Sequence, residues 1–276
     1  MITDVIDLLR CPHCGTALEL DGRVVACHGR HRFDLARQGH LNLLSTPAPA
    51  NADSAAMVAA RLAYLERGLH QPVRDLLSAS SGPVVLDAGC GPGWYLAGLP
   101  AEHRVLGMDL SAAAARRAAR AHPRAGVVVS DLRQDWPVAD AVVDTVWSVF
   151  APRHLDEVVR VLRPGGEFLV VLPGEDHLVE LVRSGAVIGQ QRDKEASLLA
   201  QLSSRLEPTR RDTVRTTVTI SDDTLVHELV AMGPSAHHRT EPPGSDRHPR
   251  GGTTSQPEQV TVSLIVRAFR LDPGGS

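Results

Sequence analysis

Three of the four cysteines in this 276-residue chain lie close together near its beginning, among several histidines. Cys11 and Cys14 are separated by two residues, and Cys27 and His31 by three, so each pair can reach one ion from a single tight turn. Thiolate and imidazole ligands in such an arrangement favour Zn²⁺ in a tetrahedral site. Four protein ligands leave no coordination position for water, so the predicted metal is structural.

The same residues allow two other interpretations, a set of buried thiols and a redox pair formed by Cys-x-x-Cys alone. Two pairs at ligand spacing favour zinc over both. The fourth ligand has three candidates, His13, His28 and His31. Spacing favours His31, because His28 directly follows Cys27 and is poorly placed to bind the same ion. Cys90 lies far away in another motif and is not expected to be a ligand.

A second group of residues that could bind a ligand is an acidic residue followed by three glycines. The segment Val-Val-Leu-Asp-Ala-Gly-Cys-Gly-Pro-Gly-Trp follows an apolar strand and precedes an expected helical stretch. Gly89, Gly91 and Gly93 let the backbone turn tightly and approach a ligand closely. A dinucleotide-binding loop needs its third glycine where this chain has Trp94, so that type of loop is disfavoured. With Asp87 before it, the pattern resembles the first motif of class I S-adenosylmethionine (AdoMet) methyltransferases.

Two more acidic residues follow the glycine loop at the ends of the next two expected strands. Asp109 is at the position where an acid accepts hydrogen bonds from ribose hydroxyls. The methyltransferase resemblance implies that Asp131 accepts the adenine amino group, with Leu132 against the ring. Either aspartate alone could be a helix cap, but both at these places after the glycine loop favour cofactor binding.

Strands and helices alternate in the middle of the chain, which is typical of an α/β open sheet with helices on both faces. The expected strands are 84–86, 105–108, 127–129, 145–149 and 167–172. The expected helices are 54–68, 112–121 and 155–162, with Asp53 and Ser111 as N-caps of the first two and Pro164–Gly166 as the turn that ends the third.

The last third of the chain has a different pattern. Strands over 214–220 and 260–271 predict an antiparallel edge to the sheet, with a helix over 224–232 between them. The segment 241–259 is rich in Pro, Gly, Ser and Thr and is expected to be a flexible loop. We therefore predict a class I, Rossmann-like methyltransferase sheet with a small zinc-binding domain before it.

The expected organisation has three parts. Residues 1–45 form a zinc-binding RNA-recognition domain, residues 46–82 a linker and helical segment, and residues 83–276 the AdoMet-dependent methyltransferase domain. No apolar run approaches the roughly 18–20 residues of a membrane span, and the first ten residues lack the apolar segment of a signal peptide. The expected location is the cytoplasm, without a membrane partner.

Charge leaves the question of a nucleic-acid partner open. The net charge of −3 gives no basic field over the whole chain. Arg23, Arg30, Arg32 and Arg37 nevertheless crowd a short stretch near the cysteines, opposed by Asp34. They could dock a phosphate backbone or form a solvated face beside a structural zinc site.

A cysteine-rich zinc segment joined to this methyltransferase motif resembles one family, the 23S rRNA (guanine-N1-)-methyltransferases. The resemblance covers nearly the whole chain, and the segments that carry it are 11–14, Cys27 with 31–34, 39–44, 53–57, 87–91 and 173–178. It favours His31 over His28 as the fourth zinc ligand. It also implies that His177 and position 70 lie near the methionine end of AdoMet, although position 70 is His70 here and usually Tyr in the family.

The resemblance implies transfer of the AdoMet methyl group to N1 of a guanine in hairpin 35 of 23S rRNA. The segment Met232–His238 resembles the actinomycete branch linked to resistance to tylosin and related macrolides. Family members suggest a homodimer whose two zinc domains form a groove for RNA. The residues expected to bind AdoMet are Asp87, Gly89, Gly91, Gly93, Trp94, Asp109, Asp131, Leu132, His177 and His70.

The sequence does not identify a general base for the guanine N1 proton, and Asp131, His154 and His177 are candidates. Phe150, Trp94 and Trp136 are the aromatic residues close enough to the motifs to stack on a base, although a core position is the more common explanation for Phe150. Two other functions are possible. The first is an AdoMet-dependent methyltransferase of a small molecule, which does not explain the zinc segment. The second is a non-enzymatic zinc-containing RNA-binding protein, which does not explain the glycine loop.

Overall fold

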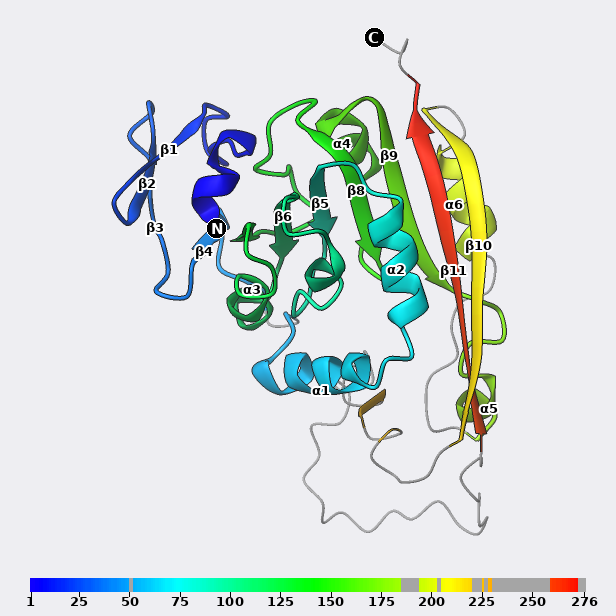
Figure 1. Ribbon diagram of the computed structural model, residues 1–276. Coiled ribbons are helices and arrows are strands. Elements are labelled where there is room, and N and C mark those ends of the chain that lie inside the picture. The colour runs from blue at the N-terminus through cyan, green and yellow to red at the C-terminus, as the bar shows by residue number, and fades with distance from the viewer. Residues whose placement is uncertain are drawn as a thin grey trace.

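The computed structural model describes residues 1–49, 52–184, 194–202, 205–219, 225, 228, 229 and 259–272. Two sheets organise this part of the chain, a small one near the N-terminus and a large one beside it (Figure 1). The small sheet is antiparallel and consists of β1 (Leu18–Asp21), β2 (Val24–Cys27) and β3 (Arg32–Asp34).

The large sheet has eight strands in the order β10-β11-β9-β8-β5-β6-β7-β4. Its strands are β4 (His40–Asn42), β5 (Val84–Ala88), β6 (Arg104–Asp109), β7 (Ala125–Val129), β8 (Val143–Val149), β9 (Leu162–Pro173), β10 (Leu206–Thr219) and β11 (Gln259–Leu271). Strands β4 to β9 pair in parallel, whereas β11 is antiparallel to both β9 and β10. This arrangement confirms the predicted α/β open sheet and its antiparallel edge.

Helices cover both faces of the large sheet. They are α1 (Ala55–Glu66), α2 (Gln71–Ala79), α3 (Ala112–Ala118), α4 (Leu155–Val161), α5 (Val179–Arg183) and α6 (Lys194–Leu202). Three short 3-10 turns accompany them: η1 (Ile2–Asp4), η2 (Ile6–Leu8) and η3 (Leu96–Gly98). Within the described residues, no helix is long and apolar enough to cross a membrane.

The core consists of two apolar layers, one on each face of the large sheet. Neighbouring residues of a strand point to opposite faces, so Val146 and Trp147 of β8 belong to different layers, and both are fully buried. The Val146 layer includes Val158 of α4, and the Trp147 layer includes Leu77 of α2. Burial on both faces explains why the parallel strands are continuous apolar runs in the sequence.

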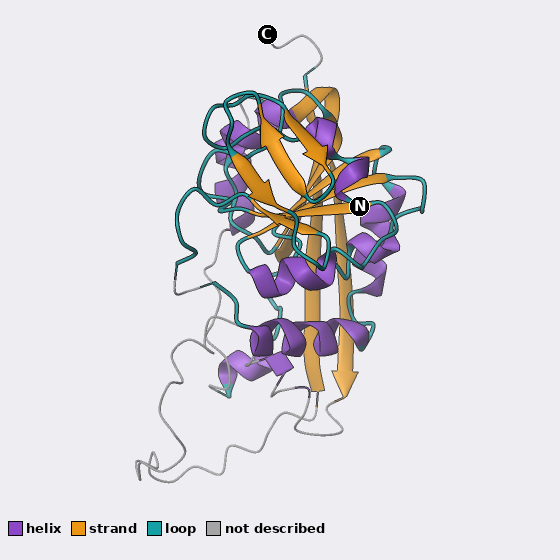
Figure 2. Ribbon diagram, turned by 90° about the vertical axis from the view of Figure 1, so that its left-hand side faces the viewer, coloured by secondary structure: helices purple, strands orange, loops and turns teal. Residues whose placement is uncertain are grey.

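The N-terminal segment fastens the small sheet to the large one. Val5 lies so close to β7 that a Cβ atom on Gly126 would collide with it. Arg124 donates to Asp4 at 3.2 Å, and Arg10 donates to Asp140 at 3.1 Å. Figure 2, viewed from the side of the small sheet, shows this sheet in front of the long strands of the large sheet. The small sheet therefore has a defined position beside the edge formed by β7 and β4.

Two local expectations are wrong, and one is confirmed. Ser54, not Asp53, caps α1, because its hydroxyl accepts the N–H of Met57 at 3.3 Å. Ser111 caps α3 as predicted, accepting the N–H of Ala114 at 3.2 Å. The turn 164–166 does not end α4, since that helix stops at Val161 and the turn lies within the span of β9.

Part of the expected C-terminal organisation lies outside the described residues. The expected helix over 224–232 is described only at residues 225, 228 and 229. The segment Met232–His238 and the expected loop over 241–259 are also outside, except that Gln259 begins β11.

Candidate metal centre and cofactor site

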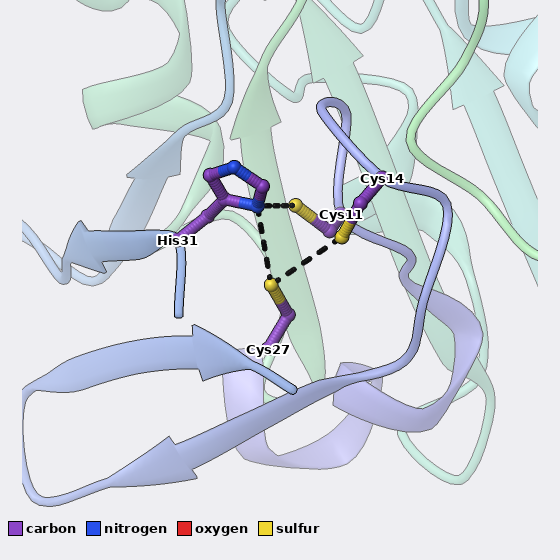
Figure 3. Close-up of side chains that lie close together, drawn as sticks. All are labelled: Cys11, Cys14, Cys27 and His31. Atoms are coloured by element: carbon purple, nitrogen blue, oxygen red, sulfur yellow. Dashed lines mark hydrogen bonds between the residues drawn. The ribbon is translucent and has the colours of Figure 1, made fainter. Parts of the chain in front are cut away.

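The four side chains predicted to bind zinc come together beside the small sheet, at the end of β2 (Figure 3). Their ligand atoms all lie within 4.8 Å of one another. His31 Nδ1 is 3.5 Å from Cys11 Sγ and 3.4 Å from Cys27 Sγ, and Cys14 Sγ is 3.5 Å from Cys27 Sγ. A tetrahedral site with Zn–S bonds of about 2.3 Å has S···S edges of about 3.8 Å. The donors and their spacing therefore fit one closed zinc site.

Each ligand pair is held by its own tight turn. The Gly15 N–H donates to the Cys11 carbonyl at 2.8 Å, and the Arg30 N–H donates to the Cys27 carbonyl at 2.9 Å. Gly15 has a φ of 71° and Arg30 a φ of 65°, both in the left-handed region. The two turns bring their ligands to one point although the pairs are far apart in sequence.

Gly29 is a residue of this site that sequence reasoning did not single out. A Cβ atom at this position would lie 3.0 Å from Cys14 Sγ and 3.3 Å from His31 Nδ1. Only glycine, which has no Cβ atom, allows Cys14 Sγ and His31 Nδ1 to keep their present positions. The available signal was the position of Gly29 between the ligands Cys27 and His31.

The other two histidines near the cluster are not part of it. His28 is exposed, and its Nε2 lies 4.0 Å from a carboxylate oxygen of Glu19. His13 stacks on Phe33, with ring centroids 5.9 Å apart and an angle of 7° between the planes. The geometry thus selects His31 from the three candidates.

The free thiols differ in acidity. A hydrogen bond with Thr16 lowers the pKa of Cys14 to about 6, whereas burial raises the pKa of Cys11 to about 11. A bound metal ion deprotonates the thiols that coordinate it. Zinc binding to this cluster would therefore release protons, most of all from Cys11.

Asp87, near the end of β5, is the most unusual polar residue of the second site. It is 1% exposed, and neither carboxylate oxygen has a hydrogen-bond partner among the described residues. Burial, with a contribution from the charge of Asp109, raises the pKa of Asp87 to about 8. Buried carboxylates without partners are costly. Asp87 therefore fits a ligand that supplies positive charge or hydrogen-bond donors, as AdoMet does.

The three glycines make a tight cradle next to Asp87. Gly89 has a φ of 93°, and a Cβ atom there would collide with Ala151. Gly93 has a φ of 79°, and its Cβ atom would lie 2.7 Å from the Cα of Ala118 in α3. At Gly91 no neighbour lies closer than 3.9 Å, so the backbone is open to a ligand. The expected helical stretch after the loop is only the 3-10 turn η3.

Asp109, at the end of β6, is tied directly to this cradle. Its two carboxylate oxygens accept the N–H groups of Gly91 and Ser111, each at 2.8 Å. Burial raises its pKa. The Ser111 hydroxyl donates to the carbonyl of Asp53 at 2.7 Å, so the segment before α1 is joined to the same corner.

A cavity of about 340 Å³ opens beside Asp109, at the carboxyl ends of β4 and β7. Open α/β sheets bind ligands at the carboxyl ends of their strands. The cavity is lined by Asn42, Leu44, Ser45, Thr46, Pro47, Ala48, Leu110, Ala112 and Val129.

The two residues predicted to bind adenine, Leu132 and Asp131, differ in their surroundings. Leu132 is buried next to the glycine cradle, 3.5 Å from where a Cβ atom of Gly89 would be. Asp131 is engaged with its neighbour Arg133, which donates to the two carboxylate oxygens at 3.0 Å each. This ion pair lowers the pKa of Asp131, which makes it a weaker proton acceptor.

The two histidines expected near the methionine end of AdoMet differ in exposure: His70 is buried and His177 is half-buried. His70 is buried between two tyrosines, with Nδ1 2.6 Å from the Tyr95 hydroxyl and Nε2 3.1 Å from the Tyr64 hydroxyl. His177 Nδ1 accepts the N–H of Ser263 at 3.2 Å. Burial lowers the pKa of His70 to about 3 and that of His177 to about 4, so both are neutral at physiological pH.

The three aromatic side chains considered for base stacking differ in how exposed they are. Trp94 is 9% exposed and lies under Arg74, whose guanidinium carbon is 4.7 Å from the ring centroid. Trp136 is 1% exposed and donates to the Leu132 carbonyl at 3.1 Å. Neither ring is exposed to an RNA base, and the expectation that Trp94 binds AdoMet stays a prediction. The core position considered for Phe150 is wrong, because Phe150 is 45% exposed.

Comparison with known proteins matches both parts of the chain. A family model described as "RlmA, N-terminal", a zinc ribbon, matches residues 9–49, and a methyltransferase domain model matches residues 85–166. The chain resembles a solved structure of a candidate methyltransferase from Bacillus halodurans, with a TM-score of 0.50 and 16% identity over 72% of this chain and 98% of that one. This likeness supports the methyltransferase fold.

Relatives over nearly the whole length are closer in sequence. The chain is 40% identical to the 23S rRNA (guanine(748)-N(1))-methyltransferase of Streptomyces fradiae, over 87% of this chain and 89% of that protein. It is 39% identical to a candidate 23S rRNA (guanine-N(1)-)-methyltransferase of Micromonospora griseorubida, over 99% and 100% of the two chains. With its zinc ribbon and its AdoMet-dependent methyltransferase domain, the chain belongs to the 23S rRNA guanine-N1-methyltransferase family.

Proposed function

We propose that this protein transfers the methyl group of AdoMet to N1 of a guanine in 23S rRNA. The observation that carries the proposal is the 40% identity to the Streptomyces fradiae enzyme, over a length that includes both the zinc ribbon and the glycine loop. The name of that relative favours guanine 748 as the target. The family resemblance implies that this guanine lies in hairpin 35 and that its methylation gives resistance to tylosin-type macrolides. A methyltransferase of small molecules would have no use for the zinc ribbon.

The cofactor site is proposed to use the ends of β5, β6 and β7. Asp87 would face the positively charged end of AdoMet, and Asp109 would receive the ribose hydroxyls while it holds Gly91 in place. Leu132 would contact the adenine ring, and Asp131 its amino group. When bound, AdoMet supplies an activated methyl group on its sulfonium sulfur. His70 and His177 would border the methionine end as neutral side chains.

The zinc ribbon is proposed to dock the RNA. Arg30, Arg32 and Arg37 are exposed, and they form no ion pair with a described residue. Guanidinium groups without a carboxylate partner are available for phosphates, and phosphate contacts position a nucleic acid without reading its sequence. In this proposal residues 1–45 recognise RNA, residues 46–82 connect, and residues 83–276 carry out methyl transfer in the cytoplasm.

Methylation at N1 also requires removal of a proton, because guanine N1 is protonated at neutral pH. Of the three candidate bases, Asp131 is paired with Arg133. The His177 Nδ1 accepts a backbone N–H, so its proton is on Nε2, and its pKa is about 4. The His154 imidazole, at the N-cap of α4, makes no hydrogen bond with a described residue, which leaves it as the candidate to test first.

The test is methylation of 23S rRNA from cells that lack the modification, followed by mass-spectrometric mapping of the product. We expect one methyl group at N1 of one guanine in hairpin 35. Sedimentation of the enzyme with and without RNA would test the homodimer that the family resemblance implies. Transfer to a small metabolite, or no transfer to rRNA and ribosomal particles alike, would contradict the proposal.

A further inference from the structure

We propose that Phe150 is the surface on which the target guanine stacks after it leaves its RNA helix, an inference that rests on the function proposed above. The chain has four Phe, three Trp and two Tyr residues, and the structure describes all of them. Phe33 is half-buried and stacked on His13, and Phe150 alone is exposed. The buried ones are Tyr64, Trp94, Tyr95, Trp136, Trp147, Phe168 and Phe269.

The backbone at Phe150 is unusual in a way that exposes the ring. Its φ is 53°, in the left-handed region that Gly and Asn occupy far more readily than Phe. The preceding residues of β8, Ser148 and Val149, are buried, so the chain changes direction where the strand ends. Strained backbone of this kind is concentrated at functional sites, where the surrounding structure maintains it.

Phe150 also stands at the right place, beside the cofactor loop. The next residue, Ala151, is packed so tightly against Gly89 that a Cβ atom on the glycine would collide with it. On another side, the ring of Phe150 lies 5.9 Å from the ring of His70, at an angle of 59°. A purine stacked on Phe150 would thus be next to the end of AdoMet that bears the methyl group.

The side chains behind Phe150 form a rigid and uncharged wall. His70 is neutral, and hydrogen bonds to the hydroxyls of Tyr64 and Tyr95 engage both of its ring nitrogens. It therefore supports Phe150 without offering a competing partner to the base. Enzymes that modify a base inside folded RNA take it out of its stack and receive it on aromatic side chains.

The first test compares the kcat/KM of rRNA methylation for Phe150→Leu and Phe150→Tyr. Leu keeps an apolar side chain but removes the π face, whereas Tyr keeps the ring. In other proteins, replacing an aromatic side chain that stacks on a base costs about 1–3 kcal/mol. We therefore expect kcat/KM to fall by about 5- to 150-fold in Phe150→Leu and to stay near normal in Phe150→Tyr. AdoMet affinity should be unchanged in both, since the ring is assigned to the RNA base.

A third variant separates stacking from folding. Phe150→Asn removes the ring but suits the left-handed backbone, so its thermal unfolding midpoint should equal or exceed that of the wild type while methylation is lost. A hairpin RNA with 2-aminopurine at the target position reports stacking directly. Its fluorescence should be quenched by the wild type and by Phe150→Tyr, and should rise with Phe150→Leu because the extruded base is unstacked.

The outcomes separate this inference from the proposed function. If the wild type methylates rRNA and Phe150→Leu or Phe150→Asn does so equally well, the stacking role is overturned and the function stands. The stacking role is also overturned if these variants lose AdoMet affinity in parallel with activity, because the ring would then support the cofactor site. If the wild type methylates no rRNA at all, the function and the inference fail together.

Discussion

The carboxylate of Asp109 accepts the backbone N–H of Gly91 at 2.8 Å, so the end of β6 holds the centre of the glycine loop. Asp109 therefore has two roles. It fixes the shape of the loop, and it is proposed to present its remaining lone pairs to the ribose of AdoMet. The second oxygen accepts the N–H of Ser111, which keeps the carboxylate in a single orientation.

Replacing Asp109 should weaken AdoMet binding without unfolding the protein. Asp109→Asn removes the charge and one acceptor, and hydrogen bonds to charged groups contribute about 1.5–3 kcal/mol. We expect a loss of affinity of about 10- to 150-fold by isothermal titration, with a far-UV circular dichroism spectrum like that of the wild type. Unchanged affinity in Asp109→Asn and in Asp87→Ala would argue against this cofactor site.

The pKa of Asp87 predicts a pH dependence of AdoMet binding. Folding raises the pKa of Asp87 from 3.8 to about 8. The contribution of the protonated Asp87 carboxyl group to folding stability is therefore complete below pH 3.8 and is lost as the pH rises through 8. A cationic ligand prefers the ionised carboxylate. Affinity for AdoMet should therefore increase by up to about tenfold per pH unit below pH 8 and then level off.

Asp87→Asn is the matched control for this prediction. The variant keeps whatever pH dependence AdoMet itself has, so the difference between the two titrations isolates the carboxyl group. Titrations in buffers of different ionisation enthalpy should show more proton release by the wild type than by Asp87→Asn. Parallel pH profiles for the wild type and Asp87→Asn would contradict the assignment.

Short-range patterns predicted the zinc ligands, and they pointed to the glycine loop as the proposed cofactor site. Cys11 and Cys14 lie on one turn, and Asp87 lies on one strand with the glycine loop after it, so spacing alone indicated their chemistry. Membership in the family and the α/β fold followed from the same motifs. The matches of the two family models at residues 9–49 and 85–166 confirm this part of the prediction.

The features that the sequence did not reveal depend on contacts between distant segments. The exposure of Phe150 depends on its left-handed backbone, and an apolar strand before it suggests the opposite. The burial of Trp94 depends on Arg74, which covers its ring from α2. The docking of Val5 on β7 involves too few residues to show a helical or strand period.

Zinc removal should separate RNA methylation from AdoMet binding. Replacing Cys11 and Cys14 together with Ser leaves only two ligands, so we expect zinc content, measured by atomic absorption, to fall from one ion per chain to none. Methylation of rRNA should fall far more than AdoMet affinity, because the proposed cofactor contacts come from the large sheet. Full rRNA methylation by the zinc-free variant would show that the ribbon is dispensable.

The matched control for the zinc variants is His28→Ala. His28 is exposed and outside the cluster, whereas His31 Nδ1 is within 3.5 Å of two thiol sulfurs. His28→Ala should retain one zinc ion, and His31→Ala should lose it or bind it much more weakly. The opposite result would transfer the fourth ligand position to His28.

Gly29 should be the most sensitive residue of the zinc ribbon that is not itself a ligand. A Cβ atom there would press on Cys14 Sγ at 3.0 Å and on His31 Nδ1 at 3.3 Å, so Gly29→Ala displaces two ligands by a few tenths of an ångström. Residues that orient metal ligands typically cost about 10- to 100-fold in metal affinity when changed, and competition with a zinc chelator measures this loss. Gly29 contains no donor group of its own, so weaker zinc binding by Gly29→Ala would show that the four ligands can meet only because this position has no side chain. Unchanged zinc affinity would mean that the turn relaxes around the added methyl group.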